Sequence, residues 1–221
     1  MRSRDLGQSF GSEHADAVRY DAYRPSYPEE LIAALAVISG IKPGEKLLEI
    51  GAGTGIATRP LAERGFSITA IEPSGHMIDV ARANLPASDY PSVNFVQQTF
   101  QDYFETARST SPNYKIVAAF TAFHWLEPVT RLGQSRQLLA NDGVLAVSLT
   151  NHLSGGESDP LHQATMPIIE SFVEQPVDDG DPNTVSVIYD GHTVADIQPP
   201  LKESELEQGQ FEIVQFKQYY A

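Results

Sequence analysis

Short hydrophobic runs alternate with amphipathic stretches along most of this chain. Five of the runs have the length and composition of strands, at residues 46–50, 66–72, 93–98, 115–122 and 144–150. Stretches with helical periodicity follow most of them, near residues 55–64, 74–85, 128–140 and 159–174. The last two strand-like runs lack alternation of hydrophobic and polar residues, which is typical of strands covered by helices on both faces. The pattern therefore predicts an α/β fold with a doubly wound, mostly parallel sheet.

Proline and glycine indicate two further helix boundaries. Pro28 suits a first helical position, and hydrophobic residues then recur on one helical face until Gly40, which should end that helix. Pro60 lies inside the predicted helix at 55–64, where it lacks a backbone donor. We therefore expect regular helix to be kinked or delayed around Pro60.

The two ends of the chain differ from its middle. Residues 1–19 are polar and irregular, which predicts a flexible N-terminal tail. Residues 175–210 are rich in proline, glycine and acidic residues, which indicates an irregular excursion, and residues 211–216 alternate as a sixth strand near a sheet edge would. With 221 residues in all, the chain from residue 20 to residue 221 fits a single domain.

Composition narrows the classes of partner. Fifteen Lys and Arg against 29 Asp and Glu give a formal net charge of -14 with no basic cluster, which argues against a nucleic-acid or membrane-surface partner. The sequence has no secretory signal, no run long enough to span a bilayer and no cysteine, so a cytoplasmic location is the expectation. The six histidines lack the spacing of common metal motifs, which predicts no metal site.

The segment LLEIGAGTG, residues 47–55, has the features of a ligand-binding loop after the first strand. Gly51, Gly53 and Gly55 depart from the dinucleotide pattern G-x-G-x-x-G, because the sixth position holds isoleucine. We expect Glu49 to place a carboxylate beside this loop, where a cation or a ribose hydroxyl is a better partner than a diphosphate. Glu72, about 20 residues beyond the glycines, stands where ribose hydroxyls are bound in such sheets. A positively charged adenosine ligand fits both carboxylates.

With YDAYRPSYPEELI, AIEPSGHMI and AFHWLEP, this loop resembles the class I S-adenosylmethionine-dependent methyltransferases, whose first motif is E/D-x-G-x-G-x-G. The likeness covers residues 20–150 and is strongest to a small-molecule branch with a methyltransferase type 11 domain that includes trans-aconitate methyltransferases. It implies a Rossmann-like sheet, with residues 20–150 as the cofactor-binding core and 151–221 as the substrate side. It also implies that the family's C-terminal strand is missing from this chain. The implied cofactor is S-adenosyl-L-methionine, and the implied reaction is methyl transfer to a small molecule, with a carboxylate oxygen as one candidate acceptor.

The resemblance also implies which residues contact the cofactor. They come from an N-terminal lid, the glycine loop and the ends of the second, third and fourth strands: Tyr20, Arg24, Glu49, Gly51, Ala52, Gly53, Thr54, Gly55, Glu72, Pro73, Ser74, Met77, Thr99, Phe100, Gln101, Thr121 and His124. Thr99 stands where the family often has an acidic residue, so either Gln101 or Asp102 could meet the exocyclic amine of adenine. Phe123 and Trp125 are implied to form walls of the substrate pocket.

Several alternatives stay open at this point. Tyr20, Tyr23 and Tyr27 are spaced as a packing stripe as well as a lid would require. His124 could act as a general base, bind the substrate, or begin the next helix together with Trp125. The whole chain could bind S-adenosylmethionine without catalysis, or act as an oxidoreductase dependent on NAD(P). The sequence is compatible with either a monomer or a homodimer.

Overall fold

The computed structural model describes residues 13–110 and 113–149, all of which belong to one compact unit. Six sequence predictions lie wholly or partly outside the described residues. They concern the first 12 residues of the flexible tail, the substrate side at 151–221, the helix near 159–174, the excursion at 175–210, the sixth strand at 211–216 and the missing C-terminal strand.

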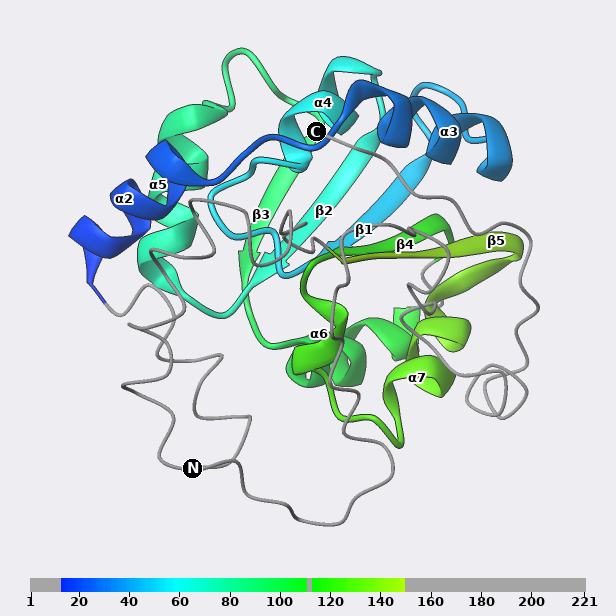
Figure 1. Cartoon of the computed structure of the whole chain (residues 1–221). Helices are drawn as coiled ribbons and strands as arrows, with labels where there is room; N and C mark the ends of the chain where they lie inside the picture. The colour runs from blue at the N-terminus through cyan, green and yellow to red at the C-terminus, as the bar shows by residue number, and fades with distance from the viewer. Residues whose placement is uncertain (1–12, 111–112, 150–221) are drawn as a thin grey trace, which may run out of the picture. The chain divides into compact units, whose positions relative to one another are not determined.

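The described residues form an α/β fold around a five-stranded parallel sheet with the order β3-β2-β1-β4-β5 (Figure 1). The strands are β1 (Lys46–Ile50), β2 (Ser67–Glu72), β3 (Val93–Gln97), β4 (Tyr114–Phe120) and β5 (Leu139–Ser148). The order reverses between β1 and β4, and a parallel sheet binds ligands beyond the carboxyl ends of its strands at such a reversal. The predicted Rossmann-like sheet is confirmed.

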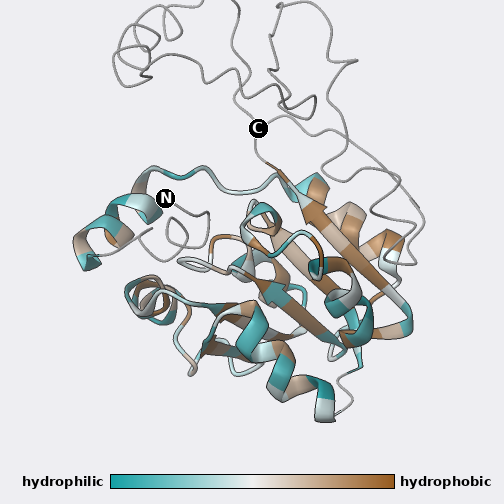
Figure 2. Ribbon diagram, turned by 90° about the horizontal axis from the view of Figure 1, so that it is seen from below, coloured by the Kyte–Doolittle hydropathy of each residue, from teal (hydrophilic) through white to brown (hydrophobic). Residues whose placement is uncertain are grey.

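Helices cover both faces of this sheet (Figure 1). One face packs on α3 (Glu29–Ser39), α4 (Thr58–Glu63) and α5 (Gly75–Asn84), and the other on α6 (Phe100–Ala107) and α7 (Arg131–Leu138). Neighbouring residues of one strand enter different cores: Leu47 joins the first and Leu48 the second. The strands are accordingly hydrophobic on both faces, as Figure 2 shows in brown.

Helix α2 (His14–Tyr23) replaces the irregular chain that we expected up to residue 19. Its sequence has little hydrophobic periodicity, and tertiary contact stabilises it instead: Ala17 is fully buried against Met77 and Val80 of α5. Those contacts involve residues some 60 positions away in the sequence. Local pattern alone could not predict them.

Helix α6 was not predicted from the sequence. Thr99 caps its N-terminus by accepting a hydrogen bond from the backbone N–H of Asp102 at 3.1 Å. Phe100 and Phe104, four residues apart, then face the second core. This capping residue and hydrophobic spacing are visible in the sequence, but the segment is only eight residues long.

The boundaries at Pro60 and Gly40 agree with prediction, whereas the start of β5 does not. Regular helix in α4 is delayed to Thr58, so Pro60 falls in the first turn. Backbone N–H groups in the first turn have no acceptor within the helix, so the missing N–H of proline costs no helical hydrogen bond there. Gly40 ends α3 with a positive φ of 64°. Strand β5 starts earlier than expected, at Leu139, which pairs with Tyr114 before a register irregularity.

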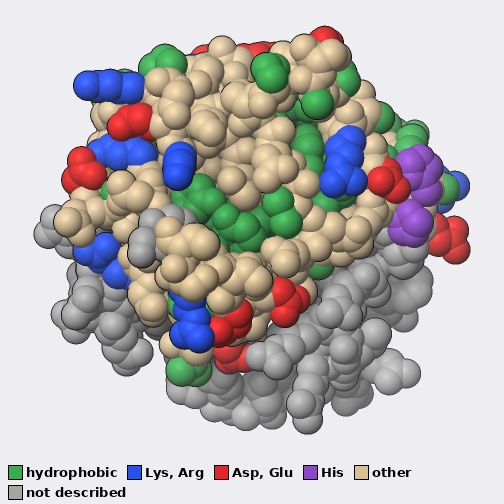
Figure 3. All heavy atoms as spheres, turned by 180° about the vertical axis from the view of Figure 1, so that it is seen from behind, with side chains coloured by type: hydrophobic (Ala, Val, Ile, Leu, Met, Phe, Trp, Pro, Cys, Tyr) green, Lys and Arg blue, Asp and Glu red, His purple; other side chains and the backbone are tan. Residues whose placement is uncertain are grey.

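Among the described residues no helix is both long and apolar enough to cross a membrane. On the face shown in Figure 3, Lys and Arg side chains lie singly among Asp and Glu rather than in one patch. On that face, the distribution gives a phosphate backbone no continuous surface to follow.

Candidate functional site

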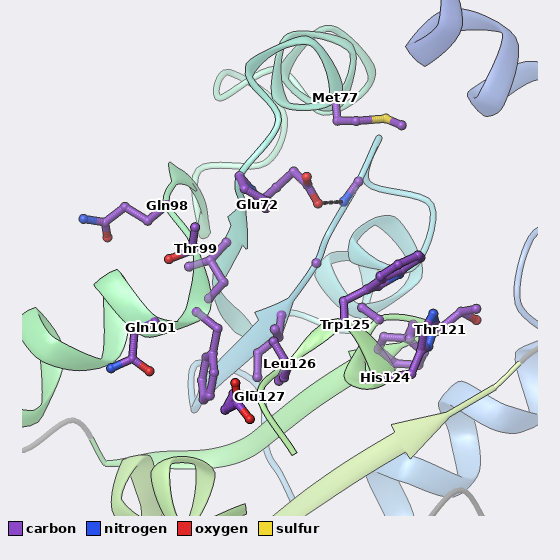
Figure 4. A pocket seen from close by; sticks show the side chains of 18 of the residues that line it. Glu72, Met77, Gln98, Thr99, Gln101, Thr121, His124, Trp125, Leu126 and Glu127 are labelled. Atoms are coloured by element: carbon purple, nitrogen blue, oxygen red, sulfur yellow. Dashed lines mark hydrogen bonds between the residues drawn. The ribbon is translucent and has the colours of Figure 1, made fainter. Parts of the chain in front are cut away.

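A pocket of about 520 Å³ lies at the carboxyl ends of the strands (Figure 4). Its walls come from the loops after β1, β2, β3 and β4 and from helix α2. Thirteen of the residues implied by the resemblance line it: Tyr20, Arg24, Gly51, Gly53, Glu72, Pro73, Met77, Thr99, Phe100, Gln101, Thr121, His124 and Trp125. The volume and the mixture of apolar walls with a few polar groups are typical of small-molecule sites.

Gly51 brings the loops after β1 and β4 together. Its φ is +69°, and a Cβ on this residue would lie 2.5 Å from Cβ of Ala122. Only glycine permits both that conformation and that approach. The backbone of the glycine loop therefore forms part of the pocket surface next to the end of β4.

Glu72 connects the glycine loop to the second strand. Its Oε2 accepts a hydrogen bond from the backbone N–H of Gly53 at 3.1 Å (Figure 4). Its Oε1 accepts one from Ser74 N–H at 2.9 Å. Burial raises the pKa of this carboxyl, and the two backbone hydrogen bonds oppose the rise. A carboxylate offers about four lone-pair sites, so both oxygens can still accept from a ligand's hydroxyls.

Glu49 does not lie beside the ligand space as expected. It is 1 % exposed, does not line the pocket and accepts a hydrogen bond from the Thr58 hydroxyl at 2.7 Å. Burial raises its pKa to about 8, so it is mainly neutral at pH 7. The inference that Glu49 selects a cation by direct contact is therefore wrong. Glu72 is the motif carboxylate that reaches the pocket.

The raised pKa of Glu49 predicts a pH-dependent stability. A carboxyl whose pKa is higher in the folded state contributes stability that is complete below about 4.5 and is lost as the pH rises through about 8. Glu49→Gln keeps an acceptor for Thr58 and cannot ionise. In the wild type, ionisation of Glu49 should lower the free energy of unfolding by up to about 1.4 kcal/mol per pH unit across this window, and in Glu49→Gln we expect this decrease to be absent. Urea unfolding at pH 5 to 8 measures this effect, with exposed Glu63→Gln as the control, and equal slopes for both variants would contradict it.

The first turn of α6, directly after β3, places the side chains of Gln101 and Asp102 differently. The Asp102 carboxylate accepts from the Thr99 hydroxyl at 2.7 Å and lies outside the pocket. Gln101 lines the pocket, where its Oε1 accepts from Nε2 of Gln134 at 2.7 Å. The side-chain geometry places Gln101 rather than Asp102 within reach of a ligand.

The segment after β4 supplies the opposite wall. Thr121 has a positive φ of 55°, uncommon for a residue other than glycine, and its Oγ1 lies 3.1 Å from the Tyr27 hydroxyl. The rings of His124 and Trp125 lie side by side with centroids 4.7 Å apart. Burial, and then the positive charge of Arg131, lower the pKa of His124, so its imidazole is neutral at pH 7.

Phe123 does not form a wall of the pocket as expected. It is 2 % exposed within the second core, with the Arg131 guanidinium 4.9 Å from its ring centroid. The short 3₁₀-helix Phe123–Trp125 turns successive side chains in different directions. Trp125 accordingly faces the pocket while Phe123 faces the core.

The three tyrosines near the N-terminus have three different environments. Tyr20 lines the pocket, and its Cε1 lies 3.9 Å from where a Cβ on Gly53 would be. Tyr23 is 84 % exposed, and Tyr27 packs on Phe120 with ring centroids 5.0 Å apart. Of the two alternatives left open by the sequence, a single packing stripe does not form, because α2 ends at Tyr23 before the spacing can continue.

Arg24 follows α2 and reaches into the pocket below Tyr20. Its guanidinium carbon lies 5.9 Å from the Tyr20 ring centroid. Its Nη2 is buried and has no hydrogen-bond partner within the described part of the chain. A buried cationic donor of this kind favours an anionic group on a ligand.

Five of the predicted site residues do not line the pocket: Glu49, Ala52, Thr54, Gly55 and Phe123. Ser74 does not line it either and instead caps α5, accepting from the Met77 N–H at 3.4 Å. Eight other residues line it without having been predicted: Ile50, Ile71, Gln98, Phe120, Ala122, Leu126, Glu127 and Gln134. Most of these lie at strand ends or beside a predicted residue, so the predicted strand boundaries could have suggested them. Gln134 reaches the site from the middle of α7, and no local signal indicated that.

Across residues 13–110 and 113–149, no group of three or more His, Asp or Glu side chains is arranged to hold a metal ion. The charged groups that converge on the pocket are instead two carboxylates, Glu72 and Glu127, and the Arg24 guanidinium.

Comparison with known proteins gives a family match over most of the chain. A family model described as a methyltransferase domain matches residues 20–181. An uncharacterized methyltransferase from Mycobacterium tuberculosis is 31 % identical over 144 residues, covering 65 % of this chain and 53 % of that protein. A ubiquinone biosynthesis O-methyltransferase from Actinobacillus pleuropneumoniae is 26 % identical over 110 residues, covering 49 % and 47 %. The chain thus spans about half the length of these curated relatives.

Solved structures show the same fold. The Haemonchus contortus phosphoethanolamine N-methyltransferase 2, in complex with phosphomonomethylethanolamine and S-adenosylhomocysteine, superposes with a TM-score of 0.56 at 17 % identity, covering 77 % of this chain and 43 % of that one. The CcbJ methyltransferase from Streptomyces caelestis gives a TM-score of 0.50 at 25 % identity, covering 64 % and 57 %.

Proposed function

Because the chain belongs to the methyltransferase domain family, we propose that it transfers a methyl group from S-adenosyl-L-methionine to a small-molecule acceptor. The observation that carries the proposal is the Glu72 carboxylate, bonded to the glycine loop at the pocket between the ends of β1, β2 and β4. A carboxylate held in this way suits ribose hydroxyls. An oxidoreductase dependent on NAD(P) would use a carboxylate at this place too, and it is the less favoured alternative because Gly51, Gly53 and Gly55 depart from the dinucleotide pattern G-x-G-x-x-G.

The residues present fit S-adenosylmethionine along the length of the pocket. Glu72 would hold the ribose hydroxyls, and the backbone of Gly51 and Gly53 leaves space for the chain that joins ribose to methionine. Arg24, whose buried Nη2 has no hydrogen-bond partner among the described residues, would meet the methionine carboxylate next to Tyr20.

At the other end of the pocket, Phe100 and Leu126 would pack on the adenine faces, and Gln101 would meet its polar edge. Met77, 3 % exposed, would complete the apolar wall. We propose Gln101 rather than Asp102 for the adenine contact, because the Asp102 carboxylate already accepts a hydrogen bond from the Thr99 hydroxyl at the start of α6.

When bound, S-adenosylmethionine supplies a sulfonium methyl that is already activated for transfer. The task of the chain's residues is then to orient the acceptor in line with the methyl–sulfur bond and to exclude water. Trp125 and Phe120 offer apolar surface for that purpose, and His124 offers a polar atom at the same wall. No covalent intermediate with the protein is needed.

We propose a carboxylate oxygen as the acceptor, as in the branch that includes trans-aconitate methyltransferases. Two features support an anionic acceptor. The positive charge of Arg131 acts on the region around His124, where it would attract an anion. The His124 imidazole is neutral at pH 7 and can donate a hydrogen bond to that anion. A carboxylate is already ionised at neutral pH, so its methylation requires no general base.

The carboxylate proposal makes His124 a binding residue rather than a base. In His124→Gln we expect KM for the acceptor to rise about tenfold while kcat changes by less than about threefold, because one hydrogen bond to the substrate is weakened. Steady-state kinetics at pH 6 to 8 measure both constants. A fall in kcat of about a hundredfold or more would instead identify His124 as a base acting on a hydroxyl or a carbon acid.

A screen for radiolabelled methyl transfer tests the proposed function. Purified protein is incubated with labelled S-adenosylmethionine and separate pools of carboxylic acids, phenols and amines. Labelled methyl ester formed from a carboxylic acid supports the proposal. Label found only in phenols or only in amines would show that the acceptor is a hydroxyl or a nitrogen instead. Absence of transfer by protein saturated with the cofactor favours the remaining alternative, a non-catalytic S-adenosylmethionine-binding protein.

A further inference from the structure

The last residue of α5, Asn84, joins three segments that meet behind the pocket. Its Nδ2 donates to Oδ2 of Asp21 on α2 at 3.0 Å and to the backbone carbonyl of Thr54 in the glycine loop at 3.3 Å. Its own carbonyl accepts from the Arg59 guanidinium of α4 at 3.2 Å. A primary amide has two N–H donors, so one side chain satisfies both contacts.

Within residues 13–110 and 113–149, few other contacts hold helix α2, and one of them is between the rings of His14 and His76, whose centroids lie 6.3 Å apart. Figure 1 shows it beside α5, and its buried contacts there consist of Ala17 with Met77 and Val80 and partly buried Tyr20. This small cluster is separate from the two main cores. A helix with so few buried apolar contacts opens at low free-energy cost, so a single well-placed hydrogen bond changes its closed fraction measurably.

Two of the three segments joined by Asn84, α2 and the glycine loop, line the pocket. Asp21 lies between two residues that line the pocket, Tyr20 and Arg24. The Tyr20 ring lies over Gly53. The carbonyl of Thr54 belongs to the same turn as Gly53, whose N–H is held by Glu72. Orienting this carbonyl therefore also orients the loop against which the cofactor would lie.

We propose that Asn84 is a positioning residue that couples closure of α2 to the glycine loop, so that the lid and the cofactor site form together. The coupling to the cofactor rests on the function proposed above. A ligand that contacts both the loop and Tyr20 or Arg24 stabilises the closed arrangement, and the Asn84 amide reduces the cost of reaching it.

The proposal can be tested by exchanging the hydrogen-bond donor and acceptor between residues 21 and 84. Asn84→Asp is nearly isosteric but turns both donors into acceptors facing the Asp21 carboxylate and the Thr54 carbonyl. Asp21→Asn alone keeps an acceptor for Asn84. In the double variant the residue 21 amide can donate to the residue 84 carboxylate, which restores the lid contact while the Thr54 carbonyl stays unpaired.

Two readouts are needed: calorimetric binding of S-adenosylhomocysteine, and hydrogen exchange of the α2 amides in the ligand-free protein. We expect Asn84→Asp to weaken binding about tenfold and to accelerate exchange in α2, and Asp21→Asn to change either by less than about threefold. The double variant should recover slow exchange in α2 and part of the affinity. Arg82→Ala is the control, since it removes a 3.2 Å bond from α5 to the Phe95 carbonyl without touching the lid.

Wild-type behaviour of Asn84→Asp in both readouts, or a double variant no better than Asn84→Asp, would overturn the proposal. Failure of the wild-type protein to bind S-adenosylhomocysteine would overturn the proposed function instead. The exchange measurement needs no ligand and still decides whether Asn84 holds the lid.

Discussion

Replacing Glu72 with alanine is expected to weaken binding of S-adenosylmethionine by at least about a hundredfold. Among the described residues the side chain accepts two hydrogen bonds, from Gly53 N–H and Ser74 N–H, and it would provide the acceptors for the ribose hydroxyls. Hydrogen bonds to a charged group contribute about 1.5 to 3 kcal/mol each, so losing two on the ligand accounts for an effect of this size. Calorimetric titration measures it directly.

Two variants separate the role of Glu72 in binding from its role in the loop. Glu72→Gln keeps one acceptor oxygen but no charge, so we expect an intermediate loss of affinity, about tenfold. Exposed Glu63→Ala controls for removing a carboxylate from an acidic chain. If Glu72→Ala binds the cofactor as the wild type does, the assignment of the ribose site to this residue is wrong.

Gly51→Ala is expected to lower the free energy of unfolding by about 3 kcal/mol. An L-residue at a φ of +69° costs about 1 to 2 kcal/mol, and forcing the new Cβ against Ala122, at 2.5 Å, adds about 1 to 3 kcal/mol of overpacking. Because Gly51 lines the pocket, the same displacement should impair binding. Urea unfolding followed by circular dichroism measures the stability term.

Matched variants divide this cost into its two parts. Gly40 has a similar φ of +64°, but a Cβ on this residue would have no other atom within 4 Å, so Gly40→Ala should cost only the backbone term, about 1 to 2 kcal/mol. Adding Ala122→Gly to Gly51→Ala removes the atom that is struck and should recover most of the remainder. Equal losses for the two alanine variants would show that the close approach of the loops carries no energetic weight.

The sequence was sufficient for the sheet and for the residues whose roles depend on local spacing. The five strands, the glycine loop and Glu72 were all predictable, because strand periodicity and the distance from glycine to carboxylate are properties of short segments. The parallel order then brings the segments after the strands to one edge. His124 and Trp125 reach the pocket for this reason.

The failures have a common physical cause, which is contact between distant segments. Glu49 carries the motif's carboxylate, yet the Thr58 hydroxyl on α4 binds it below the loop. Helix α2 depends on burial against α5, and Gln134 reaches Gln101 from 33 positions away. None of these contacts leaves a periodic trace in the sequence, so only the packed structure shows them.

The most direct test of this account is a calorimetric comparison of S-adenosylmethionine and NAD⁺ with the wild-type protein, repeated with Glu72→Ala. The account predicts saturable binding of S-adenosylmethionine that is lost in the variant, and no measurable binding of NAD⁺. Tight binding of NAD⁺ with none of S-adenosylmethionine would contradict it.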